Sequence, residues 1–586
     1  MQQAIGELIR QARRQHNLTQ TELGGTRFSK SYVSAVERNK IMSSAEALRF
    51  FAEQLGQPDD YFTSLVQQVE NVRQLSMSHA PGLPGMSNAA FQDDALTLLD
   101  ILLEGRELPN FPARYDFAAL SPEVIAALPG HKQSRYYFLT GLIAKEKQDH
   151  SEAQDAFECA LALAPVRNRP AILDELGVNY YAAKAYQIAL GYHLRALHLL
   201  QKEPGSGDAI AELRFKVELH CGDDYRALGA YQQAREHYEQ ARLHLNSEHD
   251  MRTAGILYMG LGYCTYVLIH QRTSLVIQAD ERATFEEMER EFQRAVSFLL
   301  QARSVYQVSG DRGGEASARL TLAMALLDFS TRQRQMVQEK ARAIGRQTAA
   351  NCTSLLNDAE EQCRQVLLGW QDPASGANFS GDLDTTIYMA LAYLVRIAVQ
   401  RATLARLGGY SDTAYRERAM ASYLCQQILH SLSESSLPWT LMRNAATLQS
   451  DSMAYQPPSL PRVPGLLNGR NGHVHSLMSL VEVYFAAGEV AEEIGHFATS
   501  HEYSRDSYTR ATQCFQAALD VAHLIKEKEY DRSYLVRCYQ RCTCILEERM
   551  LTSSEMFDET IRTLLTILKG ELWELQYPVL DKTLLS

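Results

Sequence analysis

The sequence predicts an all-α fold in which five short helices precede a long array of paired helices. Three observations lead to this prediction. Apolar residues recur every three or four positions along most of the 586 residues, which is typical of amphipathic helices. A motif of small and aromatic residues repeats, with its glycines 36, 45 and 40 residues apart. The beginning of the chain is basic although the chain as a whole is acidic, which separates a head from a body.

Composition narrows the class of protein. With 46% hydrophobic residues the chain can bury a core, which excludes global disorder. No stretch approaches about 18 uninterrupted apolar residues, so we expect no membrane-spanning helix. The opening segment MQQAIGELIRQARRQHN carries charges where a signal peptide has an apolar core, so we expect a cytoplasmic protein. The ten cysteines are interpreted as buried thiols.

The charge of the head points to nucleic acid. Eight basic and four acidic side chains give residues 1–49 a charge of +4, whereas the whole chain carries −12. Lys and Arg supply the affinity of proteins for phosphate. A basic head on an acidic body therefore indicates a small nucleic-acid-binding domain attached to a region with another role.

Five short helices are expected in the head. The first has an apolar stripe made of Ile5, Leu8, Ile9 and Ala12. Thr19 begins the second, which runs to about Gly25, in a capping box with Glu22. Gly56 ends the fourth, and a short turn from Asp59 forms the fifth. The inward-facing residues of the third and fourth helices are Val33, Val36, Ala45, Leu48, Phe51, Ala52 and Leu55.

The second and third helices resemble a known DNA-binding motif. The segment LTQTELGGTRFSKSYVSAVERNK (Leu18–Lys40) resembles the helix-turn-helix of the Cro/C1-repressor (XRE) family. Its turn, Gly25-Thr26-Arg27-Phe28, is one residue shorter than in most members, and in this it resembles the RRNPP family of peptide-responsive regulators. The resemblance implies a structural ion pair between Arg13 and Glu37. It also implies that Gln20 grips phosphate and braces the recognition helix.

The docking geometry of this motif suggests its DNA contacts. The first half of the recognition helix enters the major groove, which places Lys30, Ser31 and Ser34 near base edges. The alternative is that these polar residues form a solvated face. One module covers one half-site, so the expected partner is a double-stranded DNA operator bound by a homodimer. With the expected phosphate contacts and helix caps, the candidate DNA-binding residues are Thr19, Gln20, Ser29, Lys30, Ser31, Ser34, Arg38 and Lys40.

The body matches the tetratricopeptide (TPR) pattern and predicts a TPR-like α-solenoid. In the first repeat, Gly141 and Phe157 stand at positions 8 and 24, with Ala153 and Ala160 at positions 20 and 27. Small residues let two antiparallel helices approach each other, and the aromatic ring fills the space between them. The corresponding residues of later repeats are Gly177 and His193, Gly222 and Tyr238, and Gly262 with a second helix near Phe292–Gln307.

Beyond Gly310 the repeat register decays but helical periodicity persists. Ala511, Phe515 and Ala518 again show the spacing of positions 20, 24 and 27. The expected helices are 314–329, 333–356, 358–369, 385–407, 411–432, 473–488, 491–502, 507–526, 530–550 and 555–569. The expected domains are a helix-turn-helix head (1–70), a linker (71–92), TPR-like repeats (93–370), a second linker (371–384), and a degenerate TPR-like region (385–586) with an irregular insertion at 433–472.

The first helices of TPR pairs line a concave face, which here mixes polar, cationic and aromatic residues. Such a surface suits an extended peptide, and a peptide ligand is also what the resemblance to RRNPP regulators implies. A solvated helix face or a protein-docking surface remains the alternative. The candidate ligand-binding residues are Arg135, Phe138, Lys145, Asp174, Asn179, Tyr181, Lys216, Asp223, Arg226, Tyr263 and Tyr266.

The sequence shows no catalytic constellation, cofactor motif or metal site. Cys538, Cys542 and Cys544 lack a second pair of ligands, and His193 and His198 are five residues apart, off the spacing of helical zinc ligands. We therefore expect a non-enzymatic transcriptional regulator whose TPR region senses a peptide or a partner and controls the head. The alternative is a TPR interaction scaffold that the helix-turn-helix tethers to DNA.

Overall fold

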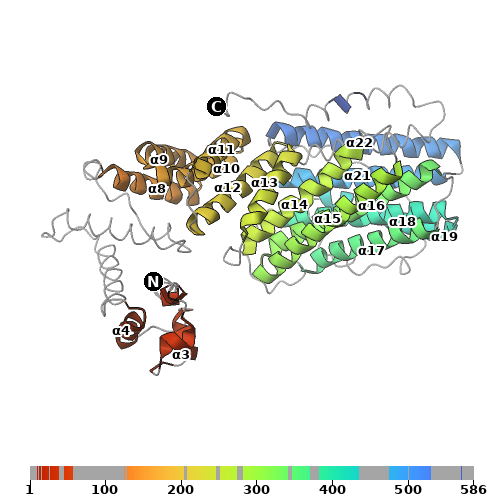
Figure 1. Ribbon diagram of the computed structural model, residues 1–586. Coiled ribbons are helices and arrows are strands. Elements are labelled where there is room, and N and C mark those ends of the chain that lie inside the picture. Colours follow the sequence, from red (N-terminus) through yellow and green to blue (C-terminus); the bar gives the residue numbers. More distant parts are fainter. Residues whose placement is uncertain are drawn as a thin grey trace. The chain divides into compact units, whose positions relative to one another are not determined.

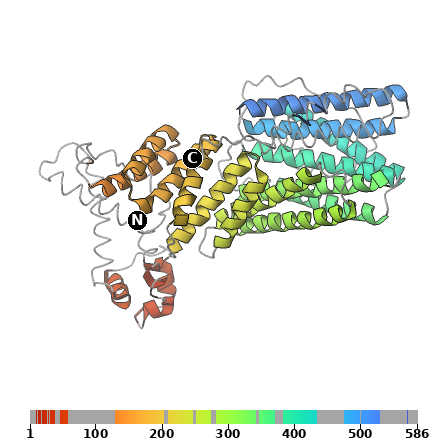
Figure 2. The ribbon, with the colours of Figure 1, turned by 45° about the horizontal axis from the view of Figure 1, so that its top comes forward.

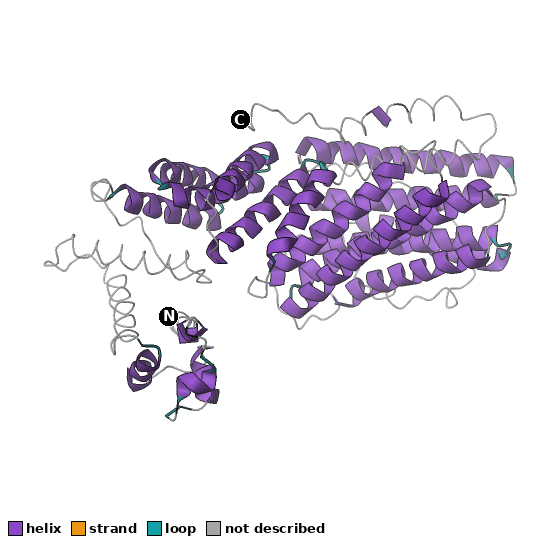
Figure 3. Cartoon of the chain, in the orientation of Figure 1, coloured by secondary structure: helices purple, strands orange, loops and turns teal. Residues whose placement is uncertain are grey.

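The structure is a computed structural model, and it describes the following residues: 9–10, 12–14, 16, 18–25, 27–28, 30–37, 45–56, 125, 129–202, 208–245, 251–273, 281–340, 346–369, 382–433, 474–498, 500–528, 566 and 569–570. Within these ranges every regular element is a helix and none is a strand (Figure 3). The all-α prediction is confirmed. The chain divides into two compact units, Met1–Asn168 and Arg169–Ser586, which are described separately.

The head has a small apolar core. Its described helices are α2 (Gln20–Gly24), α3 (Lys30–Glu37) and α4 (Ala45–Gln54). They agree with the second, third and fourth predicted helices to within one or two residues. The buried residues are Ile9, Leu23, Val33, Val36, Ala47, Leu48, Phe51, Ala52 and Leu55. Full burial of each larger apolar side chain contributes roughly 1.5–3 kcal/mol, so this cluster holds the helices together.

The short turn between α2 and α3 depends on a glycine and a phenylalanine. Gly25 has φ +53°, a conformation that L side chains rarely adopt, and a Cβ there would lie 3.0 Å from the Phe50 ring. Phe28 packs on Tyr32, Phe50 and Phe51, with ring centroids 5.0–5.6 Å apart. The Phe28 ring thus fills the space beneath this turn.

The first unit also contains a helical hairpin, α8 (Gly130–Glu146) and α9 (His150–Leu163), followed by the 3-10 turn η3 (Val166–Asn168). The Asp149 carboxylate caps α9 by accepting a hydrogen bond from the backbone N–H of Glu152 at 3.0 Å. The Ser134 hydroxyl of α8 donates to the carbonyl of Ala160 of α9 at 2.7 Å.

The second unit consists of successive helical hairpins that pack one on the next (Figures 1 and 2). Each described hairpin joins two neighbouring helices. Their bounds are α10 (Arg169–Ala182) and α11 (Tyr186–Lys202), α12 (Asp208–Ala227) and α13 (Tyr231–His244), α14 (Met251–Thr273) and α15 (Glu281–Ser309), α16 (Arg312–Lys340) and α17 (Arg346–Gly369), α18 (Asp382–Leu407) and α19 (Ser411–Ser433), and α21 (Val474–Phe497) and α22 (His501–Lys528).

A glycine of the first helix meets a ring of the second in several hairpins. A Cβ on Gly141 would lie 2.5 Å from the Phe157 ring, and one on Gly222 would lie 2.6 Å from Tyr238. These are residues predicted for positions 8 and 24, and Gly177 meets His193 in the same way. Gly488 meets Phe515 between α21 and α22, so the contact recurs near the end of the described chain. Gly262 meets the aliphatic Leu299 instead.

The predicted helix boundaries were wrong in two regions. The breaks expected near residues 330 and 357 do not exist, because α16 and α17 are each continuous. At the first of these positions the Ser330 hydroxyl is buried and donates to the carbonyl of Cys352 on α17 at 3.4 Å. The break expected after Gly488 is also absent, since this glycine lies inside α21 beneath the Phe515 ring. The helices expected at 530–550 and 555–569 lie essentially outside the described residues.

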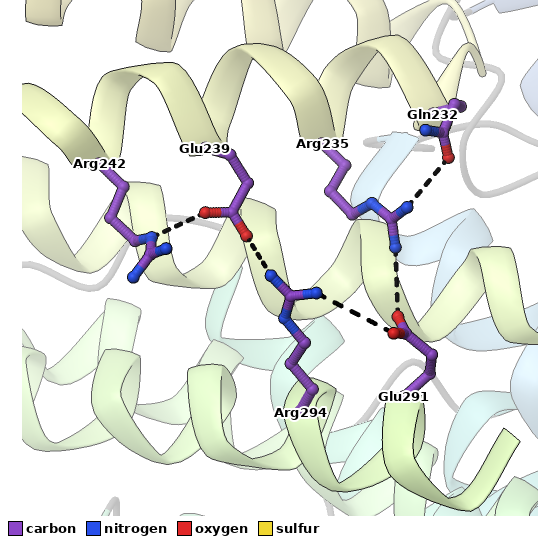
Figure 4. A network of polar contacts seen from close by, with 6 residues as sticks. All are labelled: Gln232, Arg235, Glu239, Arg242, Glu291 and Arg294. Carbon is purple, nitrogen blue, oxygen red and sulfur yellow. Dashed lines mark hydrogen bonds and ion pairs between the residues drawn. The ribbon is translucent and has the colours of Figure 1, made fainter. Parts of the chain in front are cut away.

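Two kinds of ion pair join helices that are distant in sequence. On the α13–α15 contact, Arg294 Nη2 lies 2.7 Å from Glu239 Oε1, and Arg235 Nη1 lies 3.2 Å from Glu291 Oε2 (Figure 4). These side chains are partly exposed. In the interior, Arg396 of α18 is 3% exposed. Its guanidinium lies 3.0 Å from Glu489 of α21 and 3.1 Å from Asp328 of α16.

One segment, Thr385–Leu407 of α18, is long and apolar enough to cross a membrane by length and composition alone. In this structure 83% of its apolar window is buried within the protein. The segment therefore serves as a core helix of the second unit.

Among the described cysteines, six are buried thiols, which agrees with the prediction for them. They are Cys221, Cys264, Cys352, Cys363, Cys425 and Cys514. Burial raises the pKa of Cys264 to about 12, so its thiol stays protonated at neutral pH. Cys159 is exposed, contrary to the prediction. Cys538, Cys542 and Cys544 lie outside the described residues.

Candidate functional site

The start of α2 is fixed by the predicted capping box. The Thr19 hydroxyl accepts a hydrogen bond from the Glu22 backbone N–H at 3.2 Å, and the Glu22 carboxylate accepts one from the Thr19 backbone N–H at 2.6 Å. These hydrogen bonds to Thr19 lower the pKa of Glu22. The carboxylate is therefore ionised at neutral pH, where it is the better acceptor.

A buried carboxylate fixes the end of α3. Glu37 is 2% exposed and accepts hydrogen bonds from Arg13 Nε at 2.5 Å and Arg13 Nη2 at 3.1 Å. The Gln20 side-chain amide donates to the same carboxylate at 2.7 Å. The expected Arg13–Glu37 ion pair and the bracing by Gln20 are both confirmed. One side chain of α3 thus ties together the first helical segment, α2 and α3 itself.

Helix α3 also carries candidate DNA contacts. Lys30 is exposed and Ser34 is half-buried, and their i, i+4 spacing places them on one side of the helix. Val33 and Val36 of the same helix are buried in the core of the head. Thr19 is exposed and Gln20 is half-buried at the start of α2. The side chain of Ser31 and the residues Ser29, Arg38 and Lys40 lie outside the described part of the chain.

The candidate ligand-binding residues differ in their accessibility. Asp174, Asn179 and Tyr266 are buried in the second unit, so their side chains do not face an open groove in this structure. The Tyr266 hydroxyl of α14 donates to the Asp328 carboxylate of α16. The others are half-buried: Arg135, Phe138 and Lys145 on α8 of the first unit, and Tyr181, Lys216, Asp223, Arg226 and Tyr263 in the second.

Some of the half-buried candidates are held by one another or by neighbouring rings. The Tyr238 hydroxyl donates to Asp223 Oδ1 at 2.7 Å, and Arg226 Nε donates to the Tyr238 oxygen at 3.2 Å. Tyr263 packs against Tyr231, with ring centroids 6.2 Å apart. These contacts fix the orientation of the side chains on one end of α12 and on α14.

The structure also brings together a buried polar cluster that the sequence did not predict. His193 Nδ1 of α11 lies 2.5 Å from Asp224 Oδ2 of α12, and His220 Nδ1 of α12 lies 2.8 Å from Asp174 Oδ1 of α10. His193 Nε2 lies 3.2 Å from the carbonyl oxygen of Asp174 and 3.7 Å from its Oδ1. The available signal was His193 itself, because a polar ring at a buried repeat position requires polar partners.

The electrostatics of this cluster follow from burial and proximity. Burial alone lowers the pKa of His220, but the charge and hydrogen bond of Asp174 outweigh it and raise this pKa to about 9. Burial also raises the pKa of Asp224 to about 6, although the hydrogen bond and the charge of His193 act to lower it. Imidazole and carboxylate groups are thus paired inside the helical body.

Comparison with known proteins identifies the head. Residues 9–62 match the helix-turn-helix family, which confirms the motif predicted from Leu18–Lys40. No curated protein matches the chain.

The solved structures that are similar to this chain include PlcR and a Rap protein. PlcR of Bacillus thuringiensis, in complex with the peptide PapR7 and DNA, is 16% identical, with 52% of this chain and 99% of that chain covered at a TM-score of 0.23. A Rap protein complexed with Competence and Sporulation Factor is 11% identical, with 72% of this chain and 99% of that chain covered at a TM-score of 0.27.

Proposed function

We propose that this protein is a non-enzymatic, cytoplasmic transcriptional regulator that binds a double-stranded DNA operator through its helix-turn-helix head. The observation that carries the proposal is the placement of α3 within the matched segment, where buried Glu37 fixes the helix and Lys30 is exposed. Because one such head covers one half-site, we propose that the protein acts as a homodimer on a near-palindrome.

The proposed DNA contacts are those expected from the motif. Lys30, Ser31 and Ser34 meet base edges, while the other candidates contact phosphate or cap the helix. That remaining set is Thr19, Gln20, Ser29, Arg38 and Lys40. Phosphate contacts position the protein and base contacts read the sequence.

The DNA-binding proposal predicts that Lys30→Ala combined with Ser34→Ala abolishes specific binding while the fold remains intact. The operator is first located by footprinting the protein on genomic DNA, and affinity is then measured by gel shift. Arg49→Ala is the matched control, because it removes one positive charge from an exposed position of α4 in the same head. Equal affinity of the double variant and the unmodified chain would contradict the assignment.

For the body we propose TPR-like repeats that sense a peptide, as in quorum sensing. We also propose the domain boundaries expected from the sequence, which are 1–70, 71–92, 93–370, 371–384 and 385–586. The accessible charged and aromatic candidates on the first helices of the hairpins support this. The buried candidates have an indirect role in this proposal: they hold in place the helices that line the peptide surface. These residues are Asp174, Asn179 and Tyr266. A ligand controls the head only if it binds two states of the protein with different affinity.

Lys216→Ala tests the sensing surface. The full chain is incubated with medium conditioned by its own cells, and bound peptides are identified by mass spectrometry. We expect Lys216→Ala to reduce peptide retention, and Lys202→Ala, an exposed lysine on α11, to leave it unchanged. A stable co-purifying protein, with no bound peptide, would favour the interaction scaffold instead.

A further inference from the structure

The buried cluster of the second unit has the composition of a metal site. One nitrogen of His193, one nitrogen of His220 and one carboxylate oxygen of Asp174 all lie within 4.8 Å of one another. The three residues come from α11, α12 and α10. Ligands of a tetrahedral zinc ion lie roughly 2.0–2.2 Å from the metal, so their mutual separations are of the order observed here.

A fourth residue orients one of the imidazoles. Asp224 Oδ2 accepts from His193 Nδ1 at 2.5 Å, so the Nδ1 atom carries a proton and the Nε2 atom is directed toward Asp174 and His220. Histidine ligands of metals usually donate their second N–H to a carboxylate or carbonyl in this way. Gly177 leaves room for this ring position, since a Cβ there would lie 2.2 Å from Nε2.

The cluster is closed on two sides and open on one. The side chains of His193 and Asp174 are 1% and 5% exposed, whereas that of His220 is 28% exposed. Solvent therefore reaches the cluster through His220. Through this opening an ion could enter, and solvent could complete its coordination as a fourth ligand.

We propose that Asp174, His193 and His220 bind one divalent transition-metal ion of the Zn²⁺ class. Two imidazole nitrogens and one carboxylate oxygen suit such an ion, whereas Mg²⁺ and Ca²⁺ prefer oxygen ligands alone. The ion binds Nε2 of His193 and Nδ1 of His220, and it takes the place of any proton on these two atoms. A proton displaced from either nitrogen leaves to solvent.

Metal binding would join α10, α11 and α12, because each helix contributes one ligand. The ion links the hairpin α10–α11 to the first helix of the next hairpin. It therefore stabilises the described beginning of the second unit as a single body. This role is separate from DNA recognition and does not depend on it.

The test uses the full chain, with any affinity tag removed and bound metals stripped by a chelator. Zn²⁺ is titrated by calorimetry, and retained zinc is measured after gel filtration. We expect one tightly bound equivalent that is lost, or weakened at least tenfold, in His220→Ala and in Asp174→Asn. Because Asp174→Asn keeps a hydrogen-bond acceptor near His220, we expect this variant to fold, and its loss of zinc would then reflect the loss of a metal ligand. His198→Ala, an exposed histidine on α11, should bind like the unmodified chain.

Co²⁺ provides a readout that does not depend on stability. The cobalt-loaded chain should show the visible absorption of a four-coordinate nitrogen- and oxygen-ligated ion, and His220→Ala should lose it. Failure to retain a stoichiometric ion would overturn the proposal and leave the cluster as a buried ion-pair network. Equal zinc retention by His220→Ala, Asp174→Asn and the unmodified chain would overturn it as well.

Discussion

Glu37 is the residue on which the geometry of the helix-turn-helix head depends. Its carboxylate is almost completely buried, and it accepts hydrogen bonds from the guanidinium of Arg13 and the amide of Gln20. A buried charge is tolerated only when such partners surround it, and removal of one member leaves the others unsatisfied. The position of Lys30 at the other end of α3 is set by this anchor.

We expect Glu37→Gln to destabilise the head by about 3 kcal/mol. The glutamine keeps the shape of the glutamate, but it leaves the Arg13 guanidinium without its counter-ion. Hydrogen exchange of the amides in residues 9–56, measured in the full chain, reports the loss of protection. Glu53→Gln, at an exposed position of α4, is the matched control and should change little. Exchange rates unaltered by Glu37→Gln would show that the anchor does not hold α3.

At the scale of the element, the hairpin is defined by the contact between a glycine and a ring. Tyr238 of α13 is fully buried, and its ring lies where a side chain at position 222 of α12 would begin. Two helices can approach this closely only where one of them has no Cβ. The spacing of these two residues therefore determines how the helices pair.

We expect Gly222→Ala to destabilise the second unit by roughly 1–3 kcal/mol, since the new Cβ would lie 2.6 Å from the Tyr238 ring. Gly369→Ala, at the end of α17, is the control because nothing lies within 4 Å of the point where its Cβ would stand. The higher helix propensity of alanine should leave stability equal or slightly improved in this control. The midpoint of urea unfolding is measured for both variants. Equal midpoints for Gly222→Ala and Gly369→Ala would show that the close contact of Gly222 with Tyr238 does not contribute to stability.

At the scale of the whole second unit, buried charge joins helices that are far apart in sequence. Arg396 of α18 contacts Glu489, 93 residues later, and Asp328, 68 residues earlier. These partners lie on α21 and α16, so one guanidinium links three hairpins. The ion pairs between α13 and α15 in Figure 4 are partly exposed by comparison.

We expect Arg396→Met to lower the free energy of unfolding by about 3–5 kcal/mol, because two buried carboxylates lose their counter-ion. Arg294→Ala, which breaks the exposed pair with Glu239, should lower it by less than about 1 kcal/mol. The loss in Arg294→Ala should shrink further at high salt, whereas that in Arg396→Met should persist. Thermal unfolding at two ionic strengths measures both effects, and equal losses would contradict the assigned difference in burial.

Local patterns in the sequence predicted local structure. The capping box at Thr19, the Arg13–Glu37 pair and the contact of Gly141 with Phe157 join residues at spacings typical of one motif. The prediction failed where a residue's environment came from other helices. A break was expected between residues 329 and 333, yet α16 continues through Ser330, whose hydroxyl has its acceptor on α17.

The buried cluster illustrates the same limit for sites. His193 lies 19 residues from Asp174 and 31 from Asp224, on three different helices. No helical spacing connects these residues. In the sequence, the only partner considered for His193 was His198, as a second zinc ligand on the same helix. The packing of α10, α11 and α12 creates the site, and no single segment of the sequence determines that packing.

The glycine–ring contacts also set an order of events during synthesis. Gly141 and Phe157, Gly177 and His193, and Gly222 and Tyr238 are each 16 residues apart, so each hairpin can close as soon as it leaves the ribosome. Arg396 must wait for Glu489, a further 93 residues. Until then Asp328 is the only one of its two carboxylate partners that has been made, and α18, an apolar helix, lacks the part of its cover that α21 supplies. We expect this interval to be when the nascent chain is most prone to aggregate and most dependent on chaperones.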